Sequence, residues 1–447
     1  MDKKVVYIET LGCQMNVADS ERAATRLRAA GFELCDSPEA ANFVILNTCS
    51  IREKAERKVF HRIDDIRRER AGSPPVIGLM GCVAQLEGEA IFKNAPAVKM
   101  VAGTGAIDRI PQLLEHIGES GRRAIDLEGR RDGETWDASP AERRSKHVAF
   151  VPIIEGCNKF CTYCIVPYSR GRERSRIASE IVEEVRKLQR EGYKEVQLIG
   201  QNVNSYRPKS EAGLESFKGA TPFARLLRAV ASTGMPRIKF TTSFPRDFDA
   251  DIVKAIEEHE NLCEWIHLPV QSGNDRVLRS MRRGYDVARY LEKVSAIEAS
   301  RRRLSLTSDI IVGFPGETDA EFEDTLKLVE RCRFEGLYIF KYSERKGTPA
   351  ASMPDTVPEA LKTERFRALE SLQMSIQREI YGSYVGSVVK VLVEGQSARS
   401  PSDLTGHSSC NKVLNFRGPS ELAGKIVRVH VTEAKTHSLY GEFSGEA

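Results

Sequence analysis

Short apolar segments alternate with helical patterns over most of this 447-residue chain, and this alternation constrains its fold more than any other feature. Near the N-terminus, strand-like runs are predicted at 5–9, 43–47 and 76–81, with helical patterns at 17–30 and 51–70 between them. Strands that alternate with helices are typical of βαβ units, in which crossover helices join parallel strands. Residues 1–118 are therefore predicted to form a doubly wound α/β domain with a parallel sheet.

The alternation restarts after segment 119–146, whose Gly, Asp, Glu and Arg content and weak apolar pattern predict a linker. Six strand segments with helices between them, followed by a long helix at 358–381, are typical of a partial (β/α)6 barrel that is open on one side. This second domain is predicted to span 147–381. Its strands are predicted at 149–154, 195–199, 238–242, 265–268, 306–312 and 337–341.

The last segment, 382–447, changes to short β-branched runs separated by Gly, Ser and Pro. Strands are predicted at 388–393, 412–415 and 425–432. A run of short strands with frequent turn residues predicts a small all-β domain, and a barrel is the expected form.

The composition is that of a globular protein with a notable number of cysteines. Hydrophobic residues make up 41% and charged residues 29% of the chain, which argues against general disorder. Because no apolar stretch has the length of a signal peptide or a membrane helix, we expect a cytoplasmic protein with no membrane partner. Ten cysteines in such a chain favour metal binding or catalysis over a disulfide framework.

Three cysteines, Cys157, Cys161 and Cys164, form a C-x3-C-x2-C run directly after the first strand of the predicted barrel. Three thiolates on one loop can hold three irons of a cubane cluster and leave the fourth iron open for a small molecule. A barrel of this kind places its chemistry at the C-terminal ends of its strands. The alternative is a structural zinc site completed by a distant fourth ligand.

A second set, Cys13, Cys49 and Cys82, is spread along the sequence, but each cysteine follows a predicted strand of the first domain. Because parallel strands end along one edge of their sheet, the three thiols are expected to converge there. The alternative is three redox-silent thiols that behave as small apolar residues. That interpretation is preferred for Cys35, Cys263, Cys332 and Cys410, which show no such placement.

A group of arginines follows the first cysteine set. The net charge of +4 does not by itself indicate nucleic-acid binding, so local clusters must carry that argument. A solvated surface is the alternative for any such cluster. The candidate RNA contacts are Arg170, Arg172, Arg174 and Arg176.

The C-x3-C-x2-C run, with an aromatic residue before its last cysteine, resembles the signature of the radical S-adenosylmethionine (radical SAM) superfamily. The resemblance implies that a 4Fe-4S cluster on these cysteines binds S-adenosylmethionine and cleaves it to a 5′-deoxyadenosyl radical. It also implies further cofactor contacts in the segments after two later strands. The cofactor-binding candidates are Tyr163, Gly200, Gln201, Asn202, Gly313 and Glu317.

Segments 10–16, 47–49 and 81–85 resemble the three N-terminal motifs of the methylthiotransferase family, a branch of that superfamily. The C-terminal segment resembles a TRAM domain, which binds RNA in this family, so the resemblance covers essentially the whole chain. It implies a second 4Fe-4S cluster on Cys13, Cys49 and Cys82, as the source or carrier of the inserted sulfur.

Segments 242–248, 267–273, 165–171 and 411–416 most resemble the branch that acts on N(6)-isopentenyladenosine in tRNA. The resemblance implies methylthiolation of carbon 2 of that base at position 37, next to the anticodon. The alternatives are threonylcarbamoyladenosine in tRNA, an aspartate of a ribosomal protein, or a non-enzymatic iron-sulfur protein that binds RNA or senses redox state. One departure is 404–407, where the family's usual Gly-Arg-Thr is missing.

The implied mechanism comprises radical C–H activation, sulfur insertion and methyl transfer from a second S-adenosylmethionine. The target base must leave its stack to reach a buried site, which an anticodon loop permits at modest cost. The implied partners are tRNA carrying isopentenyladenosine, an electron donor such as a flavodoxin or ferredoxin, and a sulfur or cluster donor.

Overall fold

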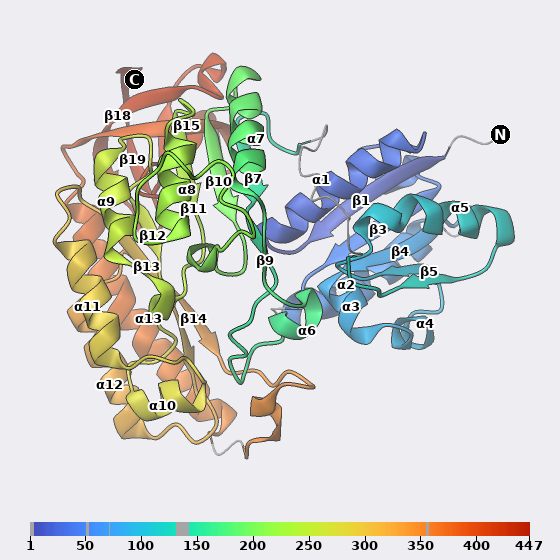
Figure 1. Ribbon diagram of the computed structural model, residues 1–447, viewed down its shortest axis with the longest axis horizontal. Helices are drawn as coiled ribbons and strands as arrows, with labels where there is room; N and C mark the ends of the chain where they lie inside the picture. The colour runs from blue at the N-terminus through green and yellow to red at the C-terminus, as the bar shows by residue number, and fades with distance from the viewer. Residues whose placement is uncertain (1–3, 51–52, 71, 131–142, 355–356) are drawn as a thin grey trace. The chain divides into compact units, whose positions relative to one another are not determined.

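The computed structural model describes residues 4–50, 53–70, 72–130, 143–354 and 357–447, which form two compact units (Figure 1). The first unit comprises Met1–Ser145, Phe150–Asn158 and Ile165–Arg174. The second comprises Lys146–Ala149, Lys159–Cys164 and Ser175–Ala447. The domain boundaries at 118, 146 and 381 stay predictions.

Six parallel strands form the sheet of the first unit, in the order β2-β1-β3-β4-β5-β6. β3 and β4 are central and almost wholly buried, as expected of parallel strands covered on both faces. The predicted α/β domain with a parallel sheet is confirmed. The strands are β1 (Val5–Leu11), β2 (Glu33–Leu34), β3 (Phe43–Thr48), β4 (Val76–Gly81), β5 (Val98–Ala102) and β6 (Ala124–Asp126).

Helices cover both faces of this sheet (Figure 1). Ile45 of β3 packs in one apolar cluster with Leu27 and Leu114, whereas its neighbour Val44 packs in another with Ile63. Successive residues of a strand point to opposite faces, so one strand serves both clusters. The first cluster lies under α1 (Gln14–Ala29) and α5 (Ile110–Ser120), and the second under α2 (Glu53–Glu69), α3 (Cys82–Glu87) and α4 (Ala90–Asn94).

The predicted linker 119–146 is wrong in its first part. Helix α5 continues to Ser120, and β6 then pairs in parallel with β5 as the sixth strand of the sheet. The Nη2 of Arg109 donates a hydrogen bond to Oδ1 of Asp126 at 3.0 Å, which holds this edge strand in place. A strand of three residues is too short to produce a readable apolar alternation. Residues 131–142 of the predicted linker lie outside the described residues.

Further strands form two three-stranded sheets, β11-β10-β7 and β12-β13-β14. The amide of Ile238 in β11 donates to the carbonyl of Asn261 at 2.7 Å, just before β12, and so links the two sheets. The predicted partial (β/α)6 barrel is confirmed. Its strands are β7 (Val148–Pro152), β10 (Glu195–Ile199), β11 (Arg237–Phe240), β12 (Trp265–His267), β13 (Ser305–Val312) and β14 (Gly336–Lys341).

Polar N-caps start the helices between these strands. The side chains of Thr221, Asp249, Asp286 and Thr318 each accept a hydrogen bond from a backbone amide in the first turn that follows. Such caps satisfy donors that have no partner within the helix. The helices are α7 (Ala178–Arg190), α8 (Pro222–Ala231), α9 (Ala250–Glu258), α10 (Asp275–Ser280), α11 (Val287–Glu298), α12 (Asp319–Cys332) and α13 (Glu359–Gly382).

After α13 the chain forms a closed barrel with the strand order β15-β16-β17-β19-β18. The predicted all-β barrel is confirmed, but β16 and β19 were not predicted because they contain few β-branched residues. Its core includes Val391, Phe416 and Val429, all fully buried. The strands are β15 (Val388–Ser397), β16 (Ser400–Ser408), β17 (Val413–Arg417), β18 (Ile426–Ala434) and β19 (Leu439–Glu446).

Buried cations join this C-terminal barrel to the (β/α) strands within the second unit. Arg237 donates to the carbonyls of His407 and Ser408, both at 2.8 Å, and pairs with Glu195 at 2.9 Å. The ammonium group of Lys412 forms an ion pair with Glu335. Both cations are therefore engaged inside the protein.

Replacing Arg237 by alanine is expected to lower the free energy of unfolding by about 3 kcal/mol, because it removes the partner of a buried carboxylate. Glu195 is only 2% exposed at its side chain. Urea denaturation followed by circular dichroism measures this change. Arg301→Ala is the control, since Arg301 is 78% exposed and its loss is expected to cost no more than about 0.5 kcal/mol. Equal effects of the two substitutions would contradict this account of the barrel contact.

None of the helices in the described ranges is long and apolar enough to cross a lipid bilayer.

Candidate functional site

The strand order of the first unit brings Cys13, Cys49 and Cys82 to one edge of its sheet. They follow β1, β3 and β4, which are adjacent strands. The order also reverses between β1 and β3, since β2 lies on the far side of β1. In open α/β sheets, ligands bind beyond the carboxyl ends of the strands at such a reversal. Cys49 and Cys82 are buried, whereas Cys13 is exposed.

Two fully buried asparagines hold the loops that carry these cysteines. Asn16 donates through Nδ2 to Oδ1 of Asn47 at 2.9 Å, and Asn47 donates back to the carbonyl of Asn16 at 2.7 Å. The amide of Cys13 donates to Oδ1 of Asn16 at 3.2 Å. Buried amides with all these partners fix the geometry of the loops.

A glycine at the start of α3 permits this close packing. Gly81 has φ +94°, and a Cβ atom there would lie 2.5 Å from Oδ1 of Asn47. Any other residue would be strained in this backbone conformation and would also collide with the asparagine. The Gly81–Cys82 pair is therefore a requirement of the site's geometry.

The thiols of this set differ in their electrostatic surroundings. A hydrogen bond with Cys49 lowers the pKa of Cys13 to about 6; desolvation of the thiol opposes this change, and the charge of Arg170 assists it. Burial raises the pKa of Cys82, while Arg170 draws it down. Since the thiolate is the form that binds metals, a cation near two of the three thiols favours metal binding.

Arg170 lies in α6 (Val166–Arg170), where its side chain is only 2% exposed. Its Nη2 forms an ion pair with Oδ2 of Asp19 at 2.6 Å, and its Nη1 lies 3.7 Å from Glu155. Glu155 in turn pairs with Nε of Arg130 at 2.9 Å. The prediction that Arg170 contacts RNA is therefore wrong, because its charge is enclosed within the first unit.

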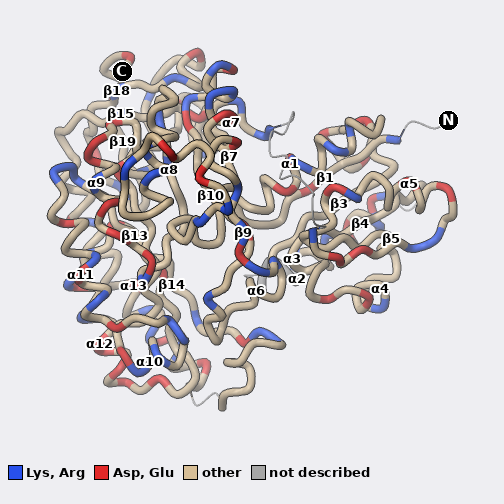
Figure 2. Tube along the Cα trace, in the orientation of Figure 1, with Lys and Arg blue, Asp and Glu red and all other residues tan. Residues whose placement is uncertain are grey.

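The prediction for Arg176 is wrong for a similar reason, since Arg176 is buried in the second unit and pairs with Glu184 at 2.8 Å. Arg172 is exposed and Arg174 is partly exposed, so RNA contact at these two stays a prediction. Figure 2 shows basic and acidic residues interspersed along the chain, so a local run of arginines does not mark a free basic surface. Asp19 lies 151 residues from Arg170 in sequence, whereas Glu184 lies 8 residues from Arg176.

The C-x3-C-x2-C stretch is held by backbone hydrogen bonds in both units. In the first unit, the amide of Cys157 donates to the carbonyl of Gly171 at 3.1 Å. In the second, the amide of Cys164 donates to the carbonyl of Cys161 at 3.0 Å. Between them, Thr162 donates from its amide to Met281 at 3.1 Å and from Oγ1 to Ser280 at 2.8 Å. The loop is thus anchored beside its two C-terminal cysteines.

Arg283 faces this loop within the second unit, and sequence reasoning missed it. Its Nη1 lies 3.4 Å from Sγ of Cys161 and 3.3 Å from the hydroxyl of Tyr163. The guanidinium also stacks 4.5 Å from the ring centre of Phe244 and donates to the carbonyl of Pro269 at 2.8 Å. In sequence it belongs to an ordinary basic pair before a glycine, and only its burial distinguishes it.

Among the other predicted cofactor residues, Gly200, Gln201 and Asn202 directly follow β10, and Asn202 is the buried N-cap of the turn Val203–Ser205. They therefore lie at the carboxyl end of a strand, and their contact with the cofactor stays a prediction.

Gly313 and Glu317 form a turn after β13. Oε2 of Glu317 accepts hydrogen bonds from the amide of Gly313 at 2.7 Å and from Arg365 at 2.9 Å. Gly313 has φ +71°, and a Cβ atom there would collide with the side chain of Lys362. The glycine thus admits a lysine from α13, and Glu317 supports the turn; contact of either residue with a ligand stays a prediction.

Two further features of the described residues bear on ligand binding. No three of their His, Cys, Asp or Glu side chains form a group that could hold a single metal ion. A cubane cluster distributes its ligands over separate irons, so this finding concerns mononuclear sites.

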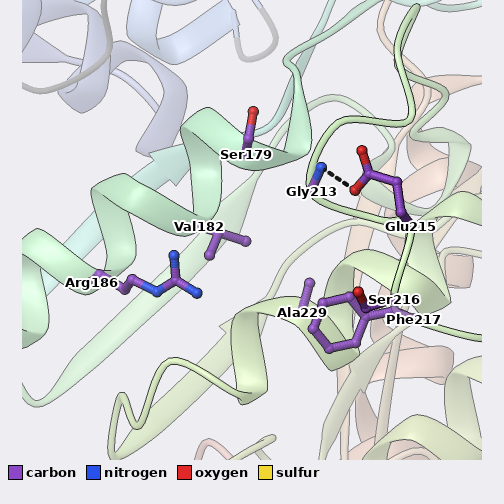
Figure 3. A pocket seen from close by; sticks show the side chains of 8 residues that line it. All are labelled: Ser179, Val182, Arg186, Gly213, Glu215, Ser216, Phe217 and Ala229. Carbon is purple, nitrogen blue, oxygen red and sulfur yellow. Dashed lines mark hydrogen bonds between the residues drawn. The ribbon is translucent and has the colours of Figure 1, made fainter.

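A cavity of about 180 Å³ lies between α7 and α8 (Figure 3). It is lined by Ser179, Arg186, Glu215 and Phe217 among others, and none of the predicted site residues lines it.

Comparisons with known proteins match all three segments of the chain. A model of the radical SAM superfamily matches residues 151–329, one of the uncharacterized protein family UPF0004 matches 5–103, and one of the TRAM domain matches 382–443. The chain is 44% identical to the tRNA-2-methylthio-N(6)-dimethylallyladenosine synthase of Koribacter versatilis, over 99% of both chains. It is 45% identical to the synthase of the same name from Bacillus subtilis, over 100% of this chain and 87% of that protein. The chain belongs to the tRNA-2-methylthio-N(6)-dimethylallyladenosine synthase family.

Membership of this synthase family confirms the predicted methylthiotransferase and its radical SAM chemistry, and it excludes the non-enzymatic alternative. The radical SAM superfamily implies S-adenosylmethionine and a 4Fe-4S cluster, so the zinc alternative for the C-x3-C-x2-C run is set aside. A relative in Solibacter usitatus with the same synthase name is 46% identical over 98% of both chains.

Solved structures at low identity share the fold alone. The radical S-adenosylmethionine methyltransferase TsrM from Kitasatospora setae has a TM-score of 0.57 at 14% identity, over 89% of this chain and 82% of that chain. The cobalamin-dependent S-adenosylmethionine radical enzyme OxsB has a TM-score of 0.54 at 11% identity, over 84% of this chain and 58% of that chain.

Proposed function

We propose that this chain methylthiolates carbon 2 of N(6)-isopentenyladenosine, also called N(6)-dimethylallyladenosine, at position 37 of tRNA. The observation that carries the proposal is the 44% to 46% identity, over nearly the whole chain, to proteins named for this synthesis. All three segments lie within that similarity.

Cys157, Cys161 and Cys164 would hold the first 4Fe-4S cluster, and the chemistry of this donor set fits it. Soft thiolates suit iron-sulfur clusters, and the loop that carries them is anchored at Thr162. Arg283 would offset the negative charge that gathers at Cys161, since its Nη1 already lies 3.4 Å from that sulfur.

Cys13, Cys49 and Cys82 would hold a second cluster. Three converging thiols and a nearby buried cation form a suitable donor set, and the exposure of Cys13 leaves a route for exchange with solvent or substrate. When bound, S-adenosylmethionine and the first cluster supply a one-electron route for breaking an aromatic C–H bond, and the second cluster supplies sulfur.

The chain's own residues would position these groups and exclude water from them. The asparagine pair Asn16 and Asn47 keeps the Cys13 and Cys49 loops together, so the thiols are arranged before binding. Arg172 and Arg174 remain the candidates for contact with the phosphate backbone. Lys412 is only 3% exposed and is engaged with Glu335, so it would support the barrel and not contact RNA.

The remaining partners are also proposals. An electron donor such as a flavodoxin or ferredoxin would reduce the first cluster, and a sulfur or cluster donor would restore the second. A cytoplasmic location would bring the enzyme together with tRNA.

Deletion of the gene is expected to remove the methylthio group from isopentenyladenosine in bulk tRNA, with unmodified isopentenyladenosine accumulating in its place. Mass spectrometry of nucleosides from the deletion strain and its parent measures both species. Return of the gene on a plasmid is the control. If methylthio-threonylcarbamoyladenosine is lost instead, the proposed substrate is wrong; if neither nucleoside changes, the ribosomal-protein alternative gains support.

A further inference from the structure

Arg170 is the residue that the corrected RNA prediction leaves without a role. It ends α6, and α6 packs against α3, the helix that begins at Cys82. The hydroxyl of Thr104 donates to the carbonyl of Ser169 at 2.7 Å, which fixes the end of α6 in the first unit. The position of the Arg170 side chain is therefore determined by packing on both sides.

The guanidinium of Arg170 reaches α1 as well. Its Nη2 lies 2.6 Å from Oδ2 of Asp19, and α1 begins directly after Cys13. One buried cation thus joins the helices that begin at two of the three cysteines. One of the two carboxylates around it is already shared, since Glu155 also pairs with Arg130 at 2.9 Å.

A buried charge is costly unless nearby groups of opposite charge offset it. Cys13 and Cys82 are among the groups whose charge acts on Arg170, together with Asp19 and Glu155. When the thiols are ionised by metal binding, the buried guanidinium offsets part of their negative charge. Positive charge and N–H donors near cluster sulfurs favour the reduced state and retain the ligands.

We propose that Arg170 is a positioning residue for the second cluster, which it retains and whose reduction potential it raises from its place between α1, which follows Cys13, and α3, which begins at Cys82. Asp19 holds the guanidinium in place and moderates its charge. This inference rests on the proposed function, because it requires that Cys13, Cys49 and Cys82 hold a cluster.

The test uses the full chain with Cys161→Ala, in which only the second cluster can assemble completely. Arg170→Gln, Arg170→Lys and Asp19→Asn are each added to this background. The measurements are iron loss to a chelator and the midpoint potential of the remaining cluster by electron paramagnetic resonance. Arg176→Gln is the matched control, since it removes a buried, ion-paired arginine from the second unit.

Arg170→Gln is expected to speed iron loss by about 10-fold and to lower the midpoint potential. Arg170→Lys, which keeps the charge, is expected to recover most of the potential. Asp19→Asn is expected to shift the potential upward, because it removes the nearest negative charge. If Arg170 had only a structural role, all variants would lower stability. The midpoint potential would then not move in opposite directions in Arg170→Gln and Asp19→Asn.

The inference is overturned if Arg170→Gln matches the Arg176→Gln control in iron retention and potential. If Arg170→Gln does not fold, the other two variants decide the question. An unchanged midpoint potential in Asp19→Asn, or a large loss of potential in Arg170→Lys, would then overturn the inference. If the Cys161→Ala parent holds no cluster at all, the proposed function fails and not merely this inference.

Discussion

Cys161→Ala is expected to abolish reductive cleavage of S-adenosylmethionine while about half of the bound iron remains. The substitution removes one of three thiolates on the C-x3-C-x2-C loop and also the sulfur that Arg283 faces at 3.4 Å. A cluster with only two protein ligands is not retained on so short a loop. Cleavage is measured as 5′-deoxyadenosine released by the reduced, reconstituted enzyme, and iron is measured by a colorimetric assay.

The matched control for this substitution is Cys332→Ala. Cys332 is buried at the C-terminal end of α12, and it belongs to neither cysteine set. Full iron content and normal cleavage are expected in this control. Cleavage that persists in Cys161→Ala, with a fully loaded second cluster, would contradict the assignment of the first triad.

Cys49→Ala is expected to separate the two halves of the reaction. The variant should still cleave S-adenosylmethionine but should form no methylthio product, because it lacks a ligand of the proposed sulfur-supplying cluster. Cys49 is 4% exposed and follows a central strand, so loss of its small side chain is expected to leave the sheet intact. Deoxyadenosine and methylthiolated RNA are measured in the same reaction.

Cys263→Ala serves as the control for this second prediction, because Cys263 is equally buried and lies in the second unit. It should retain both products. Full methylthiolation by Cys49→Ala would remove the second cluster from the mechanism and, with it, the role proposed for Arg170.

Some features of this chain can be predicted from the sequence because they depend on residues that are close together along the chain. The strands β10 and β13 were placed within a residue of their ends, since each is rich in branched aliphatic residues and is separated from the next by a helical pattern. The first cysteine triad lies within a single loop, so its spacing alone indicates a cluster. The barrel strand β16 was missed because its polar sequence lacks the pattern of a buried strand.

The position of Arg283 could not be predicted from the sequence. Its neighbours in sequence form a common basic turn, and nothing local indicates that it is buried against Cys161 and stacked on Phe244. Glu317 is similar: its local sequence does not indicate that its carboxylate accepts hydrogen bonds from the amide of Gly313 and from Arg365, and its predicted cofactor contact stays a prediction.

That the cysteines follow three strands of a parallel sheet can be read from the chain, because apolar periodicity marks where each strand ends. That these strands are neighbours is known only from the folded protein, since the order β2-β1-β3-β4 depends on which way each crossover turns. The same is true of Arg170. Its carboxylate partner Asp19 lies 151 residues away along the chain, and a charge pair at that distance becomes visible only when packing brings its members together and removes the water that would otherwise solvate them.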